Sequence, residues 1–187
     1  MHSRLTADFI EFQVNVGMRV EEALRLTWAD VQLAFERDGA GSVVSRSEIT
    51  VPGTKTERAQ ASLAINLVAA LLLQRRHEER GSWAGATVTF RDPGQPTRVV
   101  NGSALVFPIH YDQMHDCWKH CRNFLGVGDN PLATLRALRR TAARNLTTKG
   151  MPLDILRQYL RHGSIETTLG YLRLVGGYSV VEQRKWL

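Results

Sequence analysis

The N-terminal stretch of the chain shows a helical pattern of apolar and polar positions. Apolar residues recur at helical spacing over residues 7–16, which predicts a helix that Gly17 ends. A second helix is expected over residues 20–26. Glu21 and Glu22 stand in its first turn, where the helix dipole favours acidic side chains.

Residues 37–66 are expected to form short strands. β-Branched residues alternate with polar ones over residues 42–51, between two glycine-containing turn sequences. A further strand is expected over residues 61–65. It leads into a helix that continues to Gly81, so the pattern changes from extended to helical at this point.

The stretch 82–109 has two interpretations. Residues 88–90 and 99–100 can pair as strands across an Asp-Pro-Gly turn sequence, or the whole stretch can be a loop. A helix over residues 112–124 follows, and Gly126 ends it.

The final third of the chain is expected to be helical. Thr134 is the expected N-cap of a helix that has an apolar stripe and closes at Gly150. Pro152 can open the next helix, since its fixed backbone angle suits a first turn. A break follows at His162-Gly163, and Ser164 is the expected cap of the helix after it.

These elements predict an α+β fold that is mainly helical, with a small antiparallel sheet near the N-terminal half. The length suits a single domain, taken as residues 1–187. Apolar residues make up 43% of the chain and charged ones 22%, which argues against a disordered or fibrous protein. The net charge of +6 favours a polyanionic partner, although basic residues can also serve solubility alone.

The sequence predicts no membrane span, signal peptide or cofactor. The longest apolar run, residues 63–73, is too short to cross a bilayer, and residues 1–10 contain charges without an apolar run. Cys117 and Cys121 stand four apart in an expected helix, which disfavours a disulfide and fits a reducing cytoplasm. These cysteines and the neighbouring histidines match no standard zinc spacing, so we expect this stretch to be structural, with metal binding as the lesser alternative.

Candidate chemistry is concentrated near the end of the chain, at Arg136, Arg139, His162 and Tyr171. Arginine forks bind phosphate, histidine moves protons, and tyrosine can be a nucleophile. Arg136 and Arg139 are three apart, so both should project from one side of their helix, opposite its apolar stripe. Taken singly, each residue has an ordinary interpretation: a solvated arginine face, a loop histidine, or a core or surface tyrosine.

Three sets of residues follow one another in order along the chain. The first is Gly17, Met18, Arg19, Glu22, Leu26, Trp28 and Asp30. The second is Thr54-Lys55-Thr56. The third is Arg136-Ala137-Leu138-Arg139-Arg140-Thr141, Gly150, Leu160-Arg161-His162-Gly163-Ser164-Ile165, Thr167-Thr168 and Tyr171. In kind, order and spacing they resemble the motifs of the tyrosine recombinase (phage integrase) family.

The resemblance implies a catalytic domain that cuts and rejoins double-stranded DNA through a 3′-phosphotyrosyl intermediate, without ATP or metal. Tyr171 would be the nucleophile, and Arg19 and Arg139 would hold the non-bridging phosphate oxygens. Lys55, on a hairpin, would protonate the leaving 5′ oxygen. His162 would donate a hydrogen bond to the phosphate or help to position the tyrosine. The family also implies that recombinase protomers assemble as a tetramer on DNA.

Two positions depart from the family pattern. Arg136 replaces the family's first histidine; arginine stays protonated and cannot accept the tyrosine proton, although its charge can favour the phenolate. Arg161 stands where the family usually has glycine, and we expect it to alter the loop or to contact the DNA backbone. Because the motifs begin at Gly17, the N-terminal clamp domain of the family is expected to be absent from this sequence. The chain is then either an excised catalytic domain or a small member of the family that lacks the clamp.

A site-specific recombinase is therefore the leading hypothesis. One alternative is a degenerate integrase that binds DNA or a partner recombinase without cutting. Another is a relative of type IB topoisomerases, which share the nucleophile and the arginines. Residues 172–187, with a short helix expected over 180–186, either dock on a neighbouring protomer or fold back on their own domain.

Overall fold

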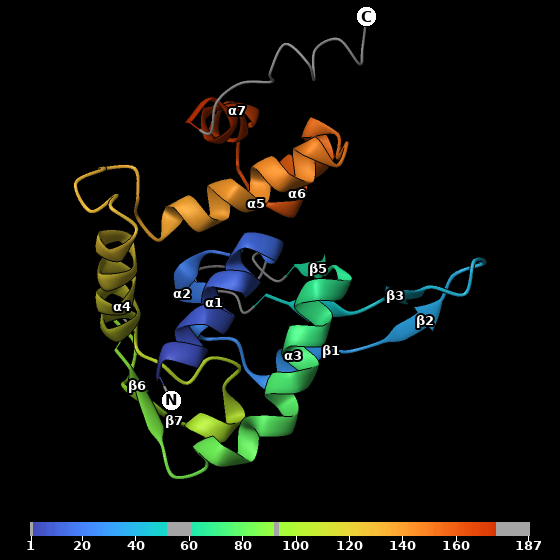
Figure 1. Cartoon of the computed structure of the whole chain (residues 1–187). Helices are drawn as coiled ribbons and strands as arrows, with labels where there is room; N and C mark the ends of the chain where they lie inside the picture. Colours follow the sequence, from blue (N-terminus) through green and yellow to red (C-terminus); the bar gives the residue numbers. More distant parts are fainter. Residues whose placement is uncertain (1, 52–60, 92–93, 175–187) are drawn as a thin grey trace, which may run out of the picture.

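The structure is mainly helical and contains small antiparallel sheets, which confirms the fold class expected from the sequence (Figure 1). The computed structural model describes residues 2–51, 61–91 and 94–174. Its helices are α1 (His2–Val16), α2 (Val20–Leu24), α3 (Leu67–Glu79), α4 (Tyr111–Phe124), α5 (Arg136–Thr148), α6 (Leu153–Tyr159) and α7 (Ile165–Leu174). Its strands are β1 (Val31–Gln32), β2 (Phe35–Arg37), β3 (Val43–Ser45), β4 (Glu48–Thr50), β5 (Ser62–Ala64), β6 (Thr87–Phe90) and β7 (Arg98–Asn101).

Helix α1 contributes one whole face to the hydrophobic core. Leu5, Phe9, Phe12 and Val16 are spaced by three or four residues, which places them on one side of the helix, and all four are buried. Helices α3, α4 and α5 pack around this helix. The ring of Phe107 meets the rings of Phe9 and Phe12, with centroid distances of 5.2 and 5.1 Å. The helix begins earlier than the expected residue 7.

A buried ion pair fixes α1 against α3. The Asp8 carboxylate accepts hydrogen bonds from Arg75 at 2.8 Å and from Arg76 at 3.1 Å. Arg76 also donates through Nε to the carbonyl of Val106 at 2.8 Å. Asp8 and Arg76 are almost fully buried, so removal of either partner would leave an uncompensated charge in the core.

The strand expected over residues 42–51 is in fact two strands in different sheets. β4 lies between β1 and β5 in a three-stranded antiparallel sheet, and β3 pairs only with β2 in a hairpin. The break falls at Ser47, whose hydroxyl accepts from the amide of Ala34 and donates to its carbonyl. The Ser47 side chain thus forms the hydrogen bonds to Ala34 that a paired backbone would otherwise form. The regular strand pairing stops here, and the chain passes from the β2–β3 hairpin to the three-stranded sheet.

The pairing expected across residues 82–109 is confirmed, and the loop interpretation is wrong. β6 and β7 form an antiparallel ladder in which Val88 lies opposite Val100. Phe90 closes this small layer, with the guanidinium carbons of Arg25 and Arg98 at 5.8 and 5.2 Å from its ring centroid.

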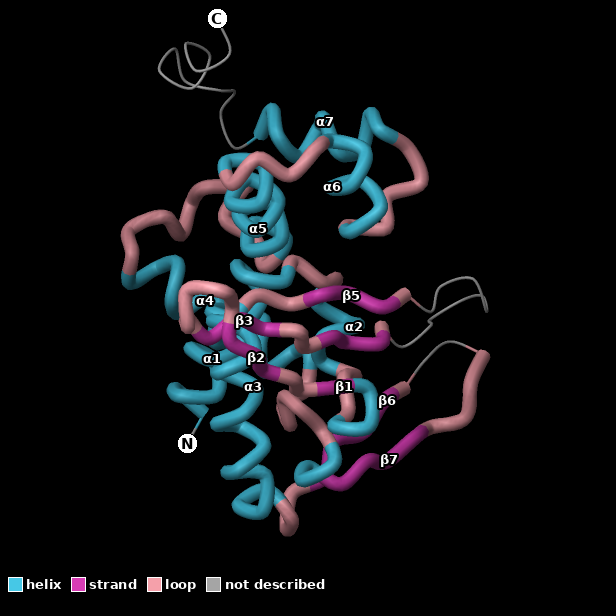
Figure 2. Tube along the Cα trace, turned by 90° about the vertical axis from the view of Figure 1, so that its right-hand side faces the viewer, coloured by secondary structure: helices cyan, strands magenta, loops and turns pink. Residues whose placement is uncertain are grey.

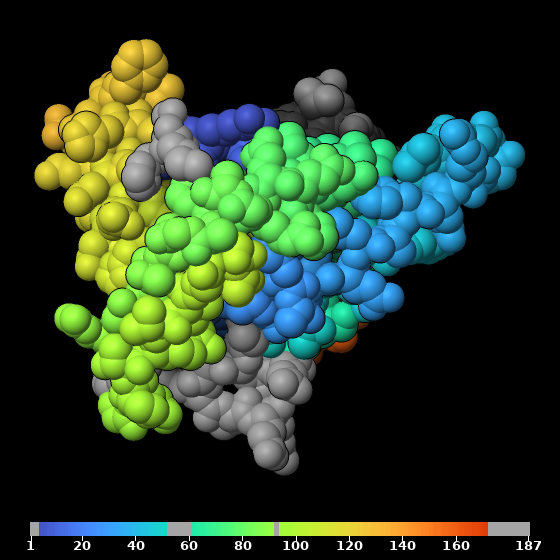
Figure 3. Space-filling model, turned by 90° about the horizontal axis from the view of Figure 1, so that it is seen from below, coloured from blue at the N-terminus to red at the C-terminus, as the bar shows by residue number. Residues whose placement is uncertain are grey.

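Helices α5, α6 and α7 lie together above α1 and α2 (Figures 1 and 2). The β2–β3 hairpin projects sideways from the molecule in Figure 1, and the space-filling view from below also shows it as a protrusion (Figure 3). Over the described ranges, no helix has both the length and the apolar character that a bilayer span requires. The helix expected over residues 180–186 lies outside the described residues.

Most helix ends of this layer follow their expected signals. Gly150 has φ +87° after α5, Pro152 directly precedes α6, and the Ser164 hydroxyl accepts the amide of Thr167 at 3.3 Å. The expected cap at Thr134 is wrong. The N-cap of α5 is Leu135, with no side-chain cap, and Thr134 accepts the amide of Ala137 through its backbone carbonyl instead.

Gly17 sets the distance between the α1–α2 turn and α5. Its φ of +72° is disfavoured for any residue with a Cβ. A Cβ placed there would also lie 2.8 Å from the Cβ of Ala142 and 3.5 Å from a methyl of Leu160. The motif glycine therefore serves both the turn and the close packing of the two layers.

We expect Gly17→Ala to lower the free energy of unfolding by about 2–4 kcal/mol, because strained backbone and overpacking add. Gly150→Ala is the matched control, since its φ is equally positive and nothing lies within 4 Å. Its expected cost is about 1 kcal/mol, from the backbone alone. Urea unfolding of both variants measures the difference.

Ala142→Gly should partly rescue Gly17→Ala, because it removes the atom that the new methyl group meets. The double variant is then less destabilised than the sum of the single variants. If Gly17→Ala and Gly150→Ala cost the same, close packing at Gly17 is not a constraint.

Candidate active site

Four of the residues expected in the site converge where α2, α5 and the α6–α7 connection meet. Arg19 is the N-cap residue of α2, and Arg139 lies on α5. His162 lies in the connection and Tyr171 on α7. Arg139 interacts electrostatically with Arg19 and Tyr171, and His162 with Arg139 and Arg19. The layer of helices therefore gathers side chains that are more than a hundred residues apart in the sequence.

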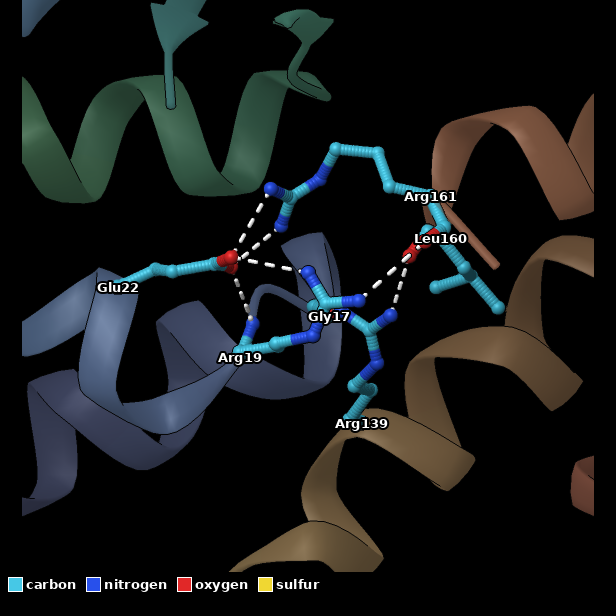
Figure 4. Close-up of polar contacts among 6 residues, drawn as sticks. All are labelled: Gly17, Arg19, Glu22, Arg139, Leu160 and Arg161. Carbon is cyan, nitrogen blue, oxygen red and sulfur yellow. Dashed lines mark hydrogen bonds and ion pairs between the residues drawn. The ribbon is translucent and has the colours of Figure 1, made fainter. Parts of the chain in front are cut away.

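Arg139 is the buried centre of this group. Its guanidinium donates through Nη1 to the carbonyl of Gly17 at 2.7 Å and through Nη2 to the carbonyl of Leu160 (Figure 4). Burial lowers the pKa of Arg139 to about 10, while the negative charge that Tyr171 can carry acts in the opposite direction. Since this value lies well above neutral pH, the site keeps a fixed positive charge at its base.

The expectation that Arg136 and Arg139 share one solvated side of α5 is wrong. Arg139 is 4% exposed, whereas Arg136, at the first residue of the helix, is exposed. Two residues three apart are rotated by about 60° around a helix, which is enough to separate a buried from an exposed position. Within the described parts of the chain, Arg136 makes no hydrogen bond or ion pair.

Arg19 is held at its two guanidinium ends and remains about half exposed. Nη1 donates to the carboxylate of Glu22 at 2.9 Å, and Nη2 donates to the carbonyl of Arg161 at 3.3 Å. The side chain is 48% exposed, so its guanidinium can meet both the protein and a ligand. Figure 4 shows Arg19 beside Arg139.

Glu22 is a site residue to which the sequence analysis assigned no role. Its carboxylate is 4% exposed and binds both Arg19 and Arg161. Burial alone would raise the pKa of Glu22, but the hydrogen bonds and charges of Arg161 and Arg19 outweigh it and lower the pKa. The available signal was its place in the first motif, three residues after Arg19, but the only physical role given to it was to complement the helix dipole.

Arg161 has a partner within the protein, while the contact with the DNA backbone expected for it stays a prediction. Both of its terminal nitrogens bind the two oxygens of Glu22, one of them at 3.0 Å. Its φ of +55° is the only positive value at a described residue other than glycine. Glycine adopts such a φ without strain, which fits the glycine that the family pattern has at this position, and an altered loop stays a prediction.

His162 is buried and lies against the ring of Tyr171. Its Nδ1 is 2.9 Å from the hydroxyl of Thr168, and its ring centroid is 4.8 Å from that of Tyr171. Burial is the main cause that lowers the pKa of His162 to about 4, and the charges of Arg139, Arg19 and Arg161 add to it. The imidazole is therefore neutral near pH 7. Thr168 contacts only its Nδ1, so this contact leaves Nε2 free for another partner.

Lys55 lies outside the described residues, so its expected position on a hairpin stays a prediction. The strands β4 and β5 that flank its segment are antiparallel neighbours. Within the described residues, no group of three His, Cys, Asp or Glu side chains could hold a metal ion. The cluster of arginines suits an anion such as a phosphodiester.

The phage integrase family model matches residues 2–175 of the chain. The chain belongs to the phage integrase family. The match covers every motif from Gly17 to Tyr171, and it confirms the family to which the sequence points. No curated protein sequence gives a significant match.

Solved structures of three recombinases have a similar fold. XerH site-specific recombinase bound to its difH substrate is 21% identical, with a TM-score of 0.58 over 91% of this chain and 43% of that one. The Tn1549 transposon integrase in complex with circular intermediate DNA is 20% identical, with a TM-score of 0.56 over 95% and 57% of the two chains. XerA recombinase is 16% identical, with a TM-score of 0.58 over 100% and 61%. The chain thus spans less than two thirds of each of these proteins.

The neutral state of His162 can be tested by titration. With a folded-state pKa of about 4 and an unfolded value near 6.5, the unfolded chain takes up a proton first as the pH falls. Stability supported by the neutral imidazole is thus complete above about pH 6.5 and is lost as the pH falls towards 4. NMR of the imidazole nitrogens should show His162 neutral at pH 5.5, with His162→Asn identifying its signals. A charged His162 at that pH would contradict the burial argument.

Proposed function

We propose that this chain is the catalytic domain of a site-specific DNA recombinase that cuts and rejoins double-stranded DNA through a 3′-phosphotyrosyl intermediate. The observation that carries the proposal is the buried Arg139 beside Tyr171 and His162, with Arg19 facing it. Membership of the phage integrase family supports the same reaction. A DNA substrate also suits the net charge of +6. We infer a cytoplasmic location from the same proposal.

In the proposed reaction, Arg19 and Arg139 hold the non-bridging oxygens of the scissile phosphate. Charge-assisted hydrogen bonds from guanidinium groups stabilise the extra negative charge of the pentacoordinate transition state. The Tyr171 oxygen forms the new bond to phosphorus and loses its proton to water, while the bond to the 5′ oxygen breaks. Lys55 gives a proton to that leaving oxygen. Rejoining reverses these steps, so the phosphoester bond energy is conserved.

Neutral His162 fits a supporting role in this reaction. Thr168 binds its Nδ1, which fixes the ring and leaves Nε2 for the phosphate. Because the ring also packs on Tyr171, it limits the directions in which the phenol can point. His162 therefore positions the nucleophile and adds a hydrogen bond without adding charge.

DNA and further copies of the chain are the proposed partners. The XerH structure contains the difH substrate, and the Tn1549 integrase structure contains circular intermediate DNA. We infer that this chain binds duplex DNA through the same fold and assembles with other protomers as a tetramer on it, with residues 172–187 available for exchange. Binding that depends on phosphate contacts should weaken steeply as salt increases.

The chemistry can be tested with a pool of duplexes that have randomised arms and a 5′-bridging phosphorothiolate. The sulfur leaving group needs no general acid and cannot be religated efficiently, so a covalent adduct accumulates. Wild type should give a denaturation-resistant protein–DNA adduct, and Tyr171→Phe should give none. Arg139→Lys should reduce the adduct about 10²-fold, because the fork that donates to phosphate is lost. An equal yield from Tyr171→Phe would reject the assigned nucleophile.

Arg136 is the residue that favours a second candidate, a DNA-binding module with little or no cleavage. It stands in the place of the family's histidine and is exposed at the start of α5. If the missing base limits the reaction, Arg136→His should raise the yield of adduct by a factor of about 10²; general bases contribute about 10²–10⁴.

The control for Arg136→His is DNA affinity, measured for both forms in the Tyr171→Phe background. Equal affinity with increased adduct identifies a weakened enzyme. Equal affinity with no adduct in either form favours the binding module. An adduct that forms as well with arginine as with histidine shows that the reaction needs no base at this position.

A further inference from the structure

Arg161 adopts a backbone conformation that is unfavourable for an arginine. Its φ of +55° lies in the left-handed region, which side chains with a Cβ disfavour and glycine does not. The family resemblance places glycine there. An arginine at this position needs a compensating interaction, and the structure contains one.

The compensating interaction is a bidentate ion pair with Glu22. Both terminal nitrogens of Arg161 meet the two carboxylate oxygens, and the two side chains are 14% and 4% exposed. A planar guanidinium fork matches a carboxylate in this geometry, whereas a lysine ammonium would offer only a point charge. The pair joins the α6–α7 connection to α2 across more than a hundred residues of sequence.

The same carboxylate holds Arg19. Oε1 of Glu22 accepts Nη1 of Arg19 at 2.9 Å, and Oε2 accepts the backbone amide of Arg19 at 3.1 Å. Arg161 binds both oxygens of this carboxylate and so fixes its plane. The fixed carboxylate in turn determines where the guanidinium of Arg19 can bind.

The left-handed turn also directs two consecutive carbonyls at two arginines. The Leu160 carbonyl accepts Arg139, and the Arg161 carbonyl accepts Nη2 of Arg19 at 3.3 Å (Figure 4). Arg161 thus acts on Arg19 in two ways. Its backbone carbonyl contacts Arg19 directly, and its side chain holds Glu22, which binds Arg19. Both contacts depend on the conformation at one residue.

We propose that Arg161 is a positioning residue that fixes the orientation of the Arg19 guanidinium before any DNA is bound. It acts through Glu22 and through its own carbonyl, and its charge is used within the protein rather than on the phosphate backbone. The benefit for cleavage rests on the proposed function. The orientation of Arg19 does not, because it can be measured on the free protein.

The test compares Arg161→Gln with Arg144→Gln, each of which removes one positive charge. Arg144 is exposed on α5 and makes no hydrogen bond or ion pair within the described residues. NMR measures rotation of the Arg19 guanidinium, whose signals are identified by Arg19→Lys. We expect Arg161→Gln to increase the rate of rotation about tenfold, the factor associated with one lost hydrogen bond to a charged group. Arg144→Gln should leave it unchanged.

Arg161→Lys and Arg161→Gly keep the test decisive if Arg161→Gln unfolds. Lysine retains the charge and glycine relieves the backbone, but both lose the fork, so both should free Arg19 in a protein that circular dichroism shows to be folded. Slow Arg19 rotation in every folded variant would overturn the proposal.

DNA measurements separate positioning from direct contact. For positioning, Arg161→Gln should form the covalent adduct about tenfold to hundredfold more slowly, as small misplacements of catalytic groups do. Its DNA affinity, in the Tyr171→Phe background, should equal that of Arg144→Gln. A much larger loss of affinity with unchanged Arg19 rotation would mean that Arg161 binds DNA and would overturn the proposal. If Arg19 is freed but no variant, wild type included, forms an adduct, the proposed function fails while the positioning role stands.

Discussion

The site depends on the burial of one cation, Arg139. Its guanidinium satisfies the carbonyl of Gly17, 122 residues away, and that of Leu160, 21 residues away. Both acceptors stand where a helix has ended or is ending, so their carbonyls lack helical partners and are free to accept. Charged hydrogen bonds of this kind repay the loss of water around the cation. The α1–α2 turn, α5 and the α6–α7 connection therefore meet at a fixed distance, which the absence of a side chain at Gly17 makes possible.

The guanidinium groups of the site would repel one another if no buried carboxylate lay between them. Arg19 and Arg161 both bind Glu22, while Arg139 relies on neutral carbonyls. One carboxylate shared by two guanidinium groups leaves the cluster with a net positive charge, which an incoming phosphate can neutralise. The same field and the burial of the ring keep His162 neutral, so this group next to Tyr171 adds no further repulsion.

Turn and capping residues in the sequence predicted the structure well where the conformation depends only on residues that are close in sequence. The ends of α1 and α5 at Gly17 and Gly150 follow from capping chemistry. The β6–β7 pairing was one of two interpretations that the sequence allowed, and the structure decided between them. The break between β3 and β4 could not be predicted, because the hydroxyl of Ser47 bonds to Ala34, on the far side of the hairpin. The exposed and buried positions of Arg136 and Arg139 were also missed, since helical spacing does not say which elements will cover a helix.

By itself, the sequence determined the family, the mainly helical fold and the identity of the residues that the proposed chemistry requires. The reason is that each motif consists of particular residue types at a fixed order and spacing along the chain, which can be recognised before the chain is folded. Only the tertiary structure decided how these residues are used. It buried Arg139, made His162 neutral, and gave Arg161 a partner in Glu22 rather than a free position on the surface. The physical reason is that burial, charge and hydrogen-bond partners depend on segments that meet only when the chain has folded.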